Sequence, residues 1–320
     1  MKAEKLVEGF WQQLLPEGGI PRIPLSELKG LVLCGMGGSG IVGSVARTLL
    51  LKRGYEKPVV TVKDYDLPPF VKDGYGVVCV SYSGNTEETL HNFRQALERG
   101  LPVWCVTSGG KLEKLAREHG LPVALVPKGL QPRFAFGYMF SRLLLMLGFT
   151  EKELKDGAEF LRAEQDGLKK LALNLAERLY GFVPALYATP LTAPAAHRWK
   201  AQLNENAKTP SHDAVLPELH HNELMGWSNF LLRDKFVYLL FKDPEDHERN
   251  LLRAELTEEL LKELGHNPVV LEGKGETLLK RTLWLINLGD WVSVLLAGLY
   301  GYDPLSIPLI KQVKERLEHA

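Results

Sequence analysis

The sequence predicts an α/β fold with two doubly wound parallel sheets, each flanked by helices. Short runs rich in β-branched residues alternate with helical patterns along most of the chain, and this alternation is typical of βαβ units with parallel strands. The chain has 320 residues, which exceeds the usual size of one hydrophobic core and favours two domains. A long charged segment after residue 149 interrupts the alternation, which then resumes.

The first half contains the elements of one sheet. Apolar runs predict strands at 31–34, 58–62, 76–81, 102–107 and 122–127. Helices are expected after the GMGGSG and SYSGNTEET segments, and KLEKLAREHG predicts a helix that ends at Gly120, since glycine is the usual residue just past a helix. The strongly apolar run at 134–149 predicts a buried closing helix.

The second half repeats this plan after a connecting helix. Residues 150–181 are charged, amphipathic and long, as expected for a helix that joins two domains. Strands are predicted at 184–189, 235–241 and 267–272, and helices at 194–207, 245–264, 276–299 and from about 306 onward. We therefore expect a first domain over residues 1–150 and a second over residues 151–320.

Net charge and hydropathy exclude several classes of partner. Lys+Arg and Asp+Glu both number 39, so the formal net charge is +0, and no global basic field attracts nucleic acid or anionic lipid. The apolar stretch 283–302 is interrupted by Asp290 and by glycines, which favours a core helix over a membrane span. The N-terminus lacks the apolar core of a signal peptide.

The cysteines agree with an intracellular setting. Cys34, Cys79 and Cys105 each lie inside or at the end of a Val/Leu-rich run. An odd number of cysteines in this spacing is no disulfide framework, and cysteines buried in such runs behave as small hydrophobic residues. Together with the N-terminal sequence, they predict a cytoplasmic protein.

Two polar loops follow predicted strands in the first half. GMGGSG (35–40) comes after the first strand and SYSGNTEET (81–89) after the third. Glycines let backbone N–H groups approach an anion at a helix N-terminus, and each loop adds hydroxyl donors. Because both loops would lie at the carboxyl edge of one parallel sheet, they predict a cage for a phosphate monoester. Its candidate residues are Gly37, Gly38, Ser39, Ser81, Ser83 and Thr86.

Two other interpretations of these loops are weaker. A dinucleotide site also begins with a glycine loop, but the spacing here is G-x-G-G-S-G, and only Asp64 and Asp66 are candidates for the acid that holds a ribose. Loops that serve only as helix caps and turns need fewer hydroxyls than this pair contains. We therefore expect phosphate binding without a cofactor.

Candidate acid–base groups occur in the second half. Glu205, in LNENAK, lies near the end of a predicted helix, where a glutamate can be a catalytic base or an ordinary surface acid. His220 and His221 are adjacent, so they cannot point the same way in a regular structure. These two residues and His212 have no histidine partner at i, i+4, and no compact set of His and Glu ligands is present, which disfavours a metal site.

Motifs in both halves resemble those of known proteins. GMGGSG followed by SYSGNTEET resembles the sugar isomerase (SIS) domain, a doubly wound phosphosugar-binding fold. RWKAQLNENAK (198–208), ELHHNE (218–223), PRF (132–134) and IPLIKQVKERL (307–317) resemble the archaeal and bacterial bifunctional phosphoglucose/phosphomannose isomerases. The resemblance extends through nearly the whole chain, with the motifs in the same order.

The resemblance implies two SIS domains and a metal-independent aldose–ketose isomerase. Such an enzyme interconverts fructose 6-phosphate with glucose 6-phosphate and mannose 6-phosphate through a cis-enediol. By the same resemblance Glu205 is the base, and His221, which directly precedes Asn222, is the acid–base group for ring opening. The neighbouring subunit of a homodimer supplies this histidine. Arg133 matches the arginine that stabilises the enediolate, and Lys311 matches a lysine near the ring oxygen, although KQVKER also reads as an ordinary basic helix face.

One segment departs from the family pattern, and one rival function is left open. The family often has a threonine after Asp-Pro near the C-terminus, which allows the rotation that admits both epimers, whereas DPLSIP (303–308) has Leu305 and Ser306. This difference bears on the mannose reaction alone. The rival function is a non-catalytic SIS-type phosphosugar sensor. Such sensors usually carry a DNA-binding helix-turn-helix ahead of the SIS domain, and residues 1–30 are short for one.

Overall fold

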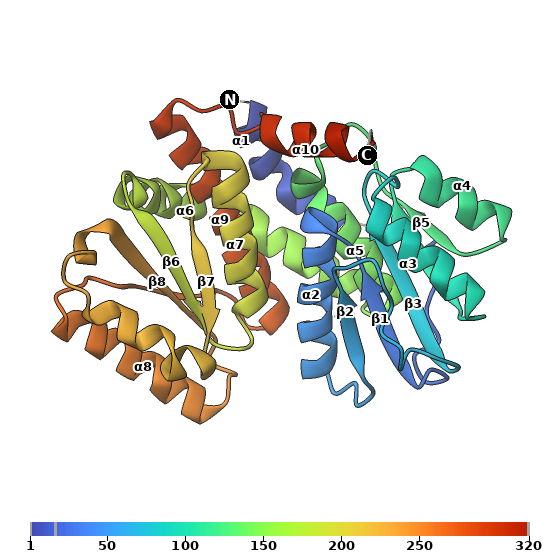
Figure 1. Ribbon diagram of the computed structural model, residues 1–320, viewed down its shortest axis with the longest axis horizontal. Coiled ribbons are helices and arrows are strands. Elements are labelled where there is room, and N and C mark those ends of the chain that lie inside the picture. Colours follow the sequence, from blue (N-terminus) through green and yellow to red (C-terminus); the bar gives the residue numbers. More distant parts are fainter. Residues whose placement is uncertain (1, 16–17, 319–320) are drawn as a thin grey trace. The chain divides into compact units, whose positions relative to one another are not determined.

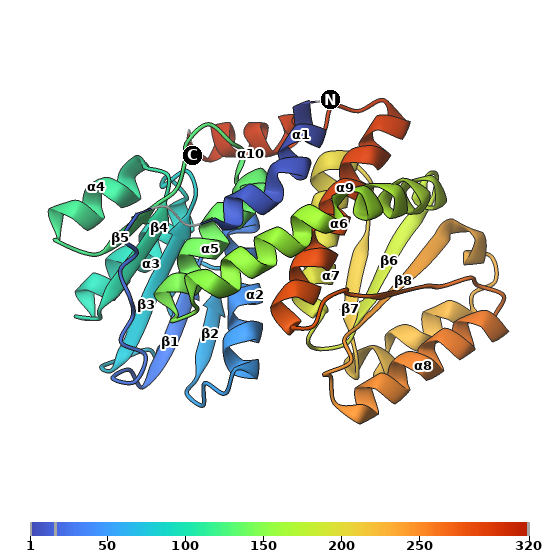
Figure 2. The same cartoon turned by 180° about the vertical axis from the view of Figure 1, so that it is seen from behind.

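The computed structural model describes residues 2–15 and 18–318, and the chain forms two compact units (Figures 1 and 2). The N-terminal unit consists of Glu8–Ala163 and Leu278–Lys280, and the C-terminal unit of Met1–Val7, Glu164–Thr277 and Arg281–Ala320. The division falls inside the long helix α6 (Glu151–Leu179), which agrees with the predicted connecting helix at 150–181.

The N-terminal unit contains a parallel five-stranded sheet in the order β2-β1-β3-β4-β5. All five predicted strands are confirmed. Their bounds are β1 (Gly30–Cys34), β2 (Val59–Val62), β3 (Tyr75–Ser81), β4 (Val103–Thr107) and β5 (Val123–Leu125). The chain moves to one side of β1 to form β2, and then to the other side to form β3 and β4. The loops after β1 and β3 therefore flank the point at which the strand order reverses, where open α/β sheets bind ligands.

The three cysteines lie side by side at the centre of this sheet. In the strand register Cys34 is opposite Cys79, and Cys79 is opposite Cys105, and all three are buried free thiols. A hydrogen bond with Cys34, together with burial, raises the pKa of Cys79 well above its usual range, and burial raises the pKa of Cys105. Since the thiolate is the reactive form, these cysteines are packing residues, as the sequence predicts.

Helices cover the N-terminal sheet. They are η1 (Gly9–Leu14), α2 (Gly37–Lys52), α3 (Glu87–Glu98), α4 (Gly110–Glu118), η2 (Pro132–Ala135) and α5 (Phe136–Met146). Helix α5 is the predicted closing helix, and nearly all of its side chains are buried. It packs against α2, the helix that the GMGGSG loop opens. Helix α5 therefore supports the start of α2, where Ser39 Oγ contacts Met139.

The C-terminal unit contains a parallel four-stranded sheet in the order β7-β6-β8-β9. Its strands are β6 (Val183–Ala188), β7 (His212–Val215), β8 (Phe236–Lys242) and β9 (Val269–Glu272). Strands β6, β8 and β9 are confirmed predictions, but β7 was missed. This order repeats that of β2-β1-β3-β4 in the N-terminal unit, so the two halves share one plan.

The helices of the C-terminal unit include one long apolar helix, α9 (Leu278–Tyr300). They are α1 (Lys2–Glu8), α7 (Ala193–Ala207), η3 (Glu218–His221), η4 (Glu223–Ser228), η5 (Arg233–Lys235), α8 (Glu248–Glu263), α9 (Leu278–Tyr300) and α10 (Pro308–Glu318). By length and composition alone α9 could cross a membrane, but 83% of its apolar window is buried inside the protein. This agrees with the predicted core helix.

Candidate functional site

The two polar loops of the N-terminal unit meet at the carboxyl edge of its sheet. Strands β1 and β3 are direct neighbours, so the loops that follow Cys34 and Ser81 are adjacent. The Tyr82 N–H donates a hydrogen bond to Ser39 Oγ at 3.1 Å, which joins the two loops. The expected juxtaposition of GMGGSG and SYSGNTEET is therefore present in the structure.

A close backbone approach brings Gly38 to Arg133. A Cβ atom added at Gly38 would lie 2.9 Å from the backbone nitrogen of Arg133, so this position has no room for any side chain. Arg133 lies in η2, and only 3% of its surface is exposed. The glycine loop and the candidate arginine are thus parts of one compact arrangement, and Gly38 is required for their contact.

The hydroxyls of the N-terminal edge fall into two groups. Ser39 and Ser81 are buried. Ser81 Oγ lies 2.9 Å from Thr86 Oγ1 and accepts a hydrogen bond from Gly84 N–H. Ser83 is exposed instead. The buried hydroxyls hold the loops in shape, whereas Ser83 faces outward from the same loop.

Thr86 leaves the start of α3 open. It occupies the N-cap position of this helix, but its side chain makes no capping hydrogen bond. Its hydroxyl lies against Ser81 instead. The first amides of a helix have no partner within the helix, and together with the helix dipole they attract an anion. The geometry of the edge therefore suits a phosphate group.

In the C-terminal unit, buried polar contacts fix α7 against α9. Arg198 donates to Asp290 at 2.8 Å, Gln202 donates to the same carboxylate at 2.7 Å, and Asn206 donates to Ser293 Oγ at 3.0 Å. These α7 residues are spaced four apart and so lie on one helix face. Burial raises the pKa of Asp290, although Arg198 and Gln202 act in the opposite direction. This network makes α7 a rigid support.

Glu205 lies on this supported helix and lines a cavity of about 470 Å³. One wall of the cavity is the end of α7, from Asn204 to Pro210, and the other is formed by residues 306–310 at the start of α10. Glu205 itself is partly buried. Lys311 follows the second wall directly, on α10, and its side chain is exposed.

The adjacent histidines differ in their surroundings. His220 Nε2 lies 2.8 Å from Thr257 Oγ1, and its Nδ1 lies 3.1 Å from Arg253 Nη1, both on α8. Burial, and next the charge of Arg253, lowers the pKa of His220. His221 is exposed. The two rings therefore have different environments, as the sequence predicts for neighbours, and His221 is the one that solvent reaches.

Glu205 and His221 lie toward opposite edges of the C-terminal sheet. Glu205 lies at the end of α7, before the amino end of β7, and His221 lies in η3, after the carboxyl end of β7. Strand β7 (212–215) separates them in the chain, and its four residues span about 10 Å at the usual rise. Within one chain these residues are not brought together.

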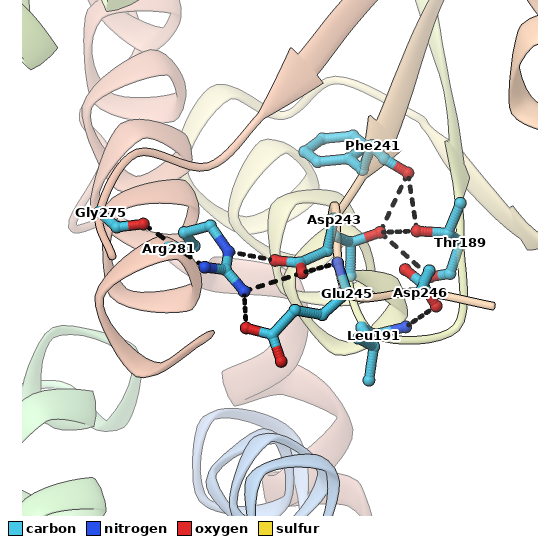
Figure 3. Close-up of polar contacts among 9 residues, drawn as sticks. Thr189, Leu191, Phe241, Asp243, Glu245, Asp246, Gly275 and Arg281 are labelled. Carbon is cyan, nitrogen blue, oxygen red and sulfur yellow. Dashed lines mark hydrogen bonds and ion pairs between the residues drawn. The ribbon is translucent and has the colours of Figure 1, made fainter. Parts of the chain in front are cut away.

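An ion cluster around the buried Arg281 and Asp243, which the sequence did not reveal, lies at the carboxyl edge of the C-terminal sheet (Figure 3). Arg281, on α9, donates to both oxygens of Asp243 at 2.7 and 2.9 Å and to Glu245 at 2.5 Å. Asp243 follows β8, and its side chain is 1% exposed. Beside it Thr192 Oγ1 donates to the Phe241 carbonyl at 3.0 Å. The acidic DPED segment after a strand was the available signal.

Metal ligands do not gather in the part of the chain that the structure describes. Among residues 2–15 and 18–318, no group of three or more His, Cys, Asp or Glu side chains is arranged to hold a metal ion. Separately, the amides and hydroxyls of the N-terminal edge could bind an anion, and Glu205 and His221 carry groups that could transfer protons.

The chain is similar to known proteins along nearly its whole length. The family model described as the bacterial phospho-glucose isomerase C-terminal SIS domain matches residues 168–317. A bifunctional phosphoglucose/phosphomannose isomerase from Aquifex aeolicus is 51% identical over 314 residues, which cover 98% of both chains. Another from Caldicellulosiruptor bescii is 36% identical over 310 residues, covering 92% of this chain and 91% of the relative.

A solved structure with the same fold is that of tagatose-6-phosphate ketose/aldose isomerase from Escherichia coli. It superposes with a TM-score of 0.71 over 95% of this chain and 88% of that chain, at 14% sequence identity. At this identity the likeness concerns the fold alone.

Proposed function

The chain belongs to the bifunctional phosphoglucose/phosphomannose isomerase family, and we propose a division of labour by which it interconverts fructose 6-phosphate with glucose 6-phosphate and mannose 6-phosphate. It is an aldose–ketose isomerase that acts on hexose phosphates. The observation that best supports the proposed site is the supported position of Glu205 on the wall of a cavity large enough for a sugar.

The N-terminal edge binds the phosphate. Ser83 and Thr86 offer hydroxyls, and the amides that open α2 and α3 provide further donors. The buried Ser39 joins the two loops, and the buried Ser81 fixes the turn of its own loop. The contact between Gly38 and Arg133 supports a role for this arginine close to the bound sugar phosphate, where its fixed charge stabilises the enediolate.

Glu205 moves the proton between C1 and C2. It removes the proton from C1 of the ketose or C2 of the aldose, which gives a cis-enediol, and returns it to the other carbon. The polar network that holds α7 against α9 supports this assignment, because a base must be held in place to act. Lys311, on the helix that continues from the opposite cavity wall, assists near the ring oxygen.

His221 opens the sugar ring in the active site of a partner subunit. Its exposure and its place beyond β7, at the sheet edge opposite to Glu205, support a site completed by a second chain. An imidazole suits this proton transfer because its ordinary pKa lies near neutrality. The functional form is thus a homodimer with a shared active site. The sensor alternative is disfavoured because the relatives are enzymes.

The wider assignments follow from the same family. We propose that residues 1–150 and 151–320 form two SIS domains, each with its own parallel sheet, and that the enzyme works in the cytoplasm without a metal or cofactor. Ser306 lines the same cavity as Glu205, so the DPLSIP segment bears on the mannose reaction.

Two variants test the assigned roles. Glu205→Gln keeps the size and hydrogen bonding of the side chain but removes the base, so it should abolish solvent exchange of the transferred proton, at C2 of an aldose or C1 of the ketose, for every substrate. His221→Ala should be slower on cyclic hexose phosphates by a factor on the order of 10²–10⁴. It should be much less impaired on a tetrose phosphate, which cannot form a pyranose ring.

Mixing the two inactive variants tests the shared site. Heterodimers of Glu205→Gln and His221→Ala subunits contain one intact pair of residues, so part of the activity should return. His220→Asn is the matched control, since His220 is bound to α8. Any activity that His220→Asn loses should not return when it is mixed with Glu205→Gln. If both variants lose activity equally on the tetrose phosphate and mixing restores nothing, the roles are wrongly assigned.

A further inference from the structure

Lys208 has a backbone conformation that lysine rarely adopts. It ends α7 with φ 55° and ψ 30°, in the left-handed region, and among the described residues it is the one non-glycine position with a positive φ. Glycine or asparagine normally occupies such a place at the end of a helix. A lysine that remains in this conformation has a side chain whose contacts compensate for the strain.

The Lys208 ammonium is surrounded by backbone carbonyl oxygens. It donates to those of Glu205 at 2.7 Å and Asn206 at 3.2 Å, and to those of Asp303 at 3.0 Å and Ser306 at 2.8 Å. An ammonium has three N–H donors, so these four acceptors use its full capacity. No neutral side chain of similar length can replace this arrangement.

The four carbonyls belong to two segments, 205–206 and 303–306, and Glu205 and Ser306 from these segments line one cavity. Glu205 and Asn206 lie in the last turn of α7, where helix carbonyls lack partners within the helix. Asp303 and Ser306 lie in the turn before α10, in which Ser306 N–H donates to Asp303 at 3.1 Å. Lys208 thus connects the wall that bears Glu205 to the wall at 306–310.

We propose that Lys208 is a positioning residue that sets the gap between Glu205 and the opposite cavity wall, and thereby the ratio of the two aldose products. The proposal rests on the proposed role of Glu205 as the base. Glucose and mannose phosphates differ only in configuration at C2, so the enediol must be protonated there on opposite faces. A single base reaches both faces only if the sugar turns in the cavity, and the gap between its walls governs that turn.

The first test is Lys208→Gly. Glycine adopts the left-handed conformation without strain, so this variant removes the ammonium while easing the backbone. We expect kcat to fall on the order of 10–100-fold, as for a base misplaced by about 1 Å. KM should change much less, because the phosphate is held by other residues. The ratio of mannose 6-phosphate to glucose 6-phosphate formed from fructose 6-phosphate should also shift.

Chemical rescue separates positioning from general damage. n-Butylammonium matches the missing side chain and should restore part of kcat and move the product ratio back in Lys208→Gly. Tetramethylammonium at the same concentration has no N–H donor and should restore nothing. Lys57→Gly is the matched control, since Lys57 also donates to carbonyls, those of Leu25 and Ser26, but in the N-terminal unit. It should leave the product ratio unchanged.

The outcomes distinguish this proposal from the proposed function. If Lys208→Gly keeps the wild-type kcat and product ratio while Glu205→Gln is inactive, Lys208 has no positioning role and the base assignment stands. Loss of kcat that n-butylammonium does not relieve, with an unchanged product ratio, also overturns the positioning role. If Glu205→Gln retains proton exchange, the base assignment itself is wrong.

Discussion

The two units differ in the loops that follow equivalent strands. In the N-terminal unit the loops after β1 and β3 are rich in glycine and serine. In the C-terminal unit the loop after β6 contains threonines, and the loop after β8 contains acids. At the first edge, Ser39 joins the two loops by accepting a hydrogen bond from Tyr82 N–H, and Ser81 accepts one from Gly84 N–H within its own loop. At the second, the buried Arg281 is bound to the buried Asp243 and the exposed Glu245 (Figure 3). One strand order thus supports two different edges.

This difference indicates which edge binds substrate. A phosphate group at the second edge would meet the carboxylates of Asp243 and Glu245, and like charges repel. The guanidinium that could have bound it already makes a bidentate contact with Asp243. At the first edge two helices begin beside the hydroxyls, and the acids in the first turn of α3, Glu87 and Glu88, are exposed and partly exposed instead of buried. We infer that each chain binds one phosphate, at the N-terminal edge.

The largest effect is expected from Arg281→Met. Removal of the guanidinium leaves the buried Asp243 carboxylate without its cation, which typically costs about 3–5 kcal/mol. The C-terminal unit should unfold at a lower urea concentration, as measured by hydrogen exchange of β8 and β9, while the N-terminal sheet is protected as before. The double variant Arg281→Met/Asp243→Asn should recover part of the loss. Wild-type protection of β8 in the single variant would contradict a stabilising role for the cluster.

A smaller effect, on binding instead of stability, is expected from Ser83→Ala. Loss of one hydrogen bond to a charged phosphate costs about 1.5–3 kcal/mol, so KM should rise roughly 10–100-fold. The unfolding midpoint should stay unchanged because Ser83 is exposed. Thr192→Val is the matched change at the other edge and should leave KM at the wild-type value. Equal KM values for Ser83→Ala and wild type would exclude this hydroxyl from the phosphate site.

The smallest effect concerns the edge strands β2 and β7, which occupy equivalent positions in the two sheets. Strand β2 is apolar, but β7 is held by charge. Burial would raise the pKa of Asp213, yet hydrogen bonds from His197 and Lys200 lower it to about 2. Because the folded-state pKa is below the ordinary 3.8, the carboxylate stabilises the fold above pH 4, and this contribution is lost as the pH falls toward 2.

Asp213→Asn tests this pH dependence. The variant should be less stable than wild type by about 1–2 kcal/mol at pH 7, and the difference should shrink as the pH is lowered from 4 to 2. Urea unfolding of both proteins across this range measures it. A difference that stays constant down to pH 2 would show that packing, not charge, accounts for the effect.

The contrast between apolar strands and the charged strand β7 explains which elements could be predicted from the sequence. Strands with an apolar run, such as GVVCVS and KFVYLLF, were found because buried parallel strands are continuously hydrophobic. Strand β7 has the sequence HDAV and no such run. It pairs with β6 and is fixed by contacts of Asp213 with α7, which are tertiary features that no local pattern records.

Some features of the candidate site could be predicted from the sequence, and others could not. The adjacency of the glycine loop and the Ser81–Thr86 loop follows from parallel strand order and could be predicted. The burial of Ser39 and Ser81 could not, because both belong to hydroxyl-rich loops that read alike in sequence. Lys208 and Arg281 were missed for another reason, since their partners lie 95 and 38 positions away in the chain. Only the folded structure brings such residues together.

The most direct test of one phosphate site per chain is a calorimetric titration with sorbitol 6-phosphate, an open-chain analogue that cannot isomerise. Wild type should bind one equivalent per chain. Asp243→Asn, which alters only the C-terminal edge, should bind the same single equivalent, whereas Ser83→Ala should bind it on the order of 10-fold or more weakly. Two equivalents per chain in wild type, or weaker binding in Asp243→Asn together with unchanged binding in Ser83→Ala, would contradict the assignment of the phosphate to the N-terminal edge.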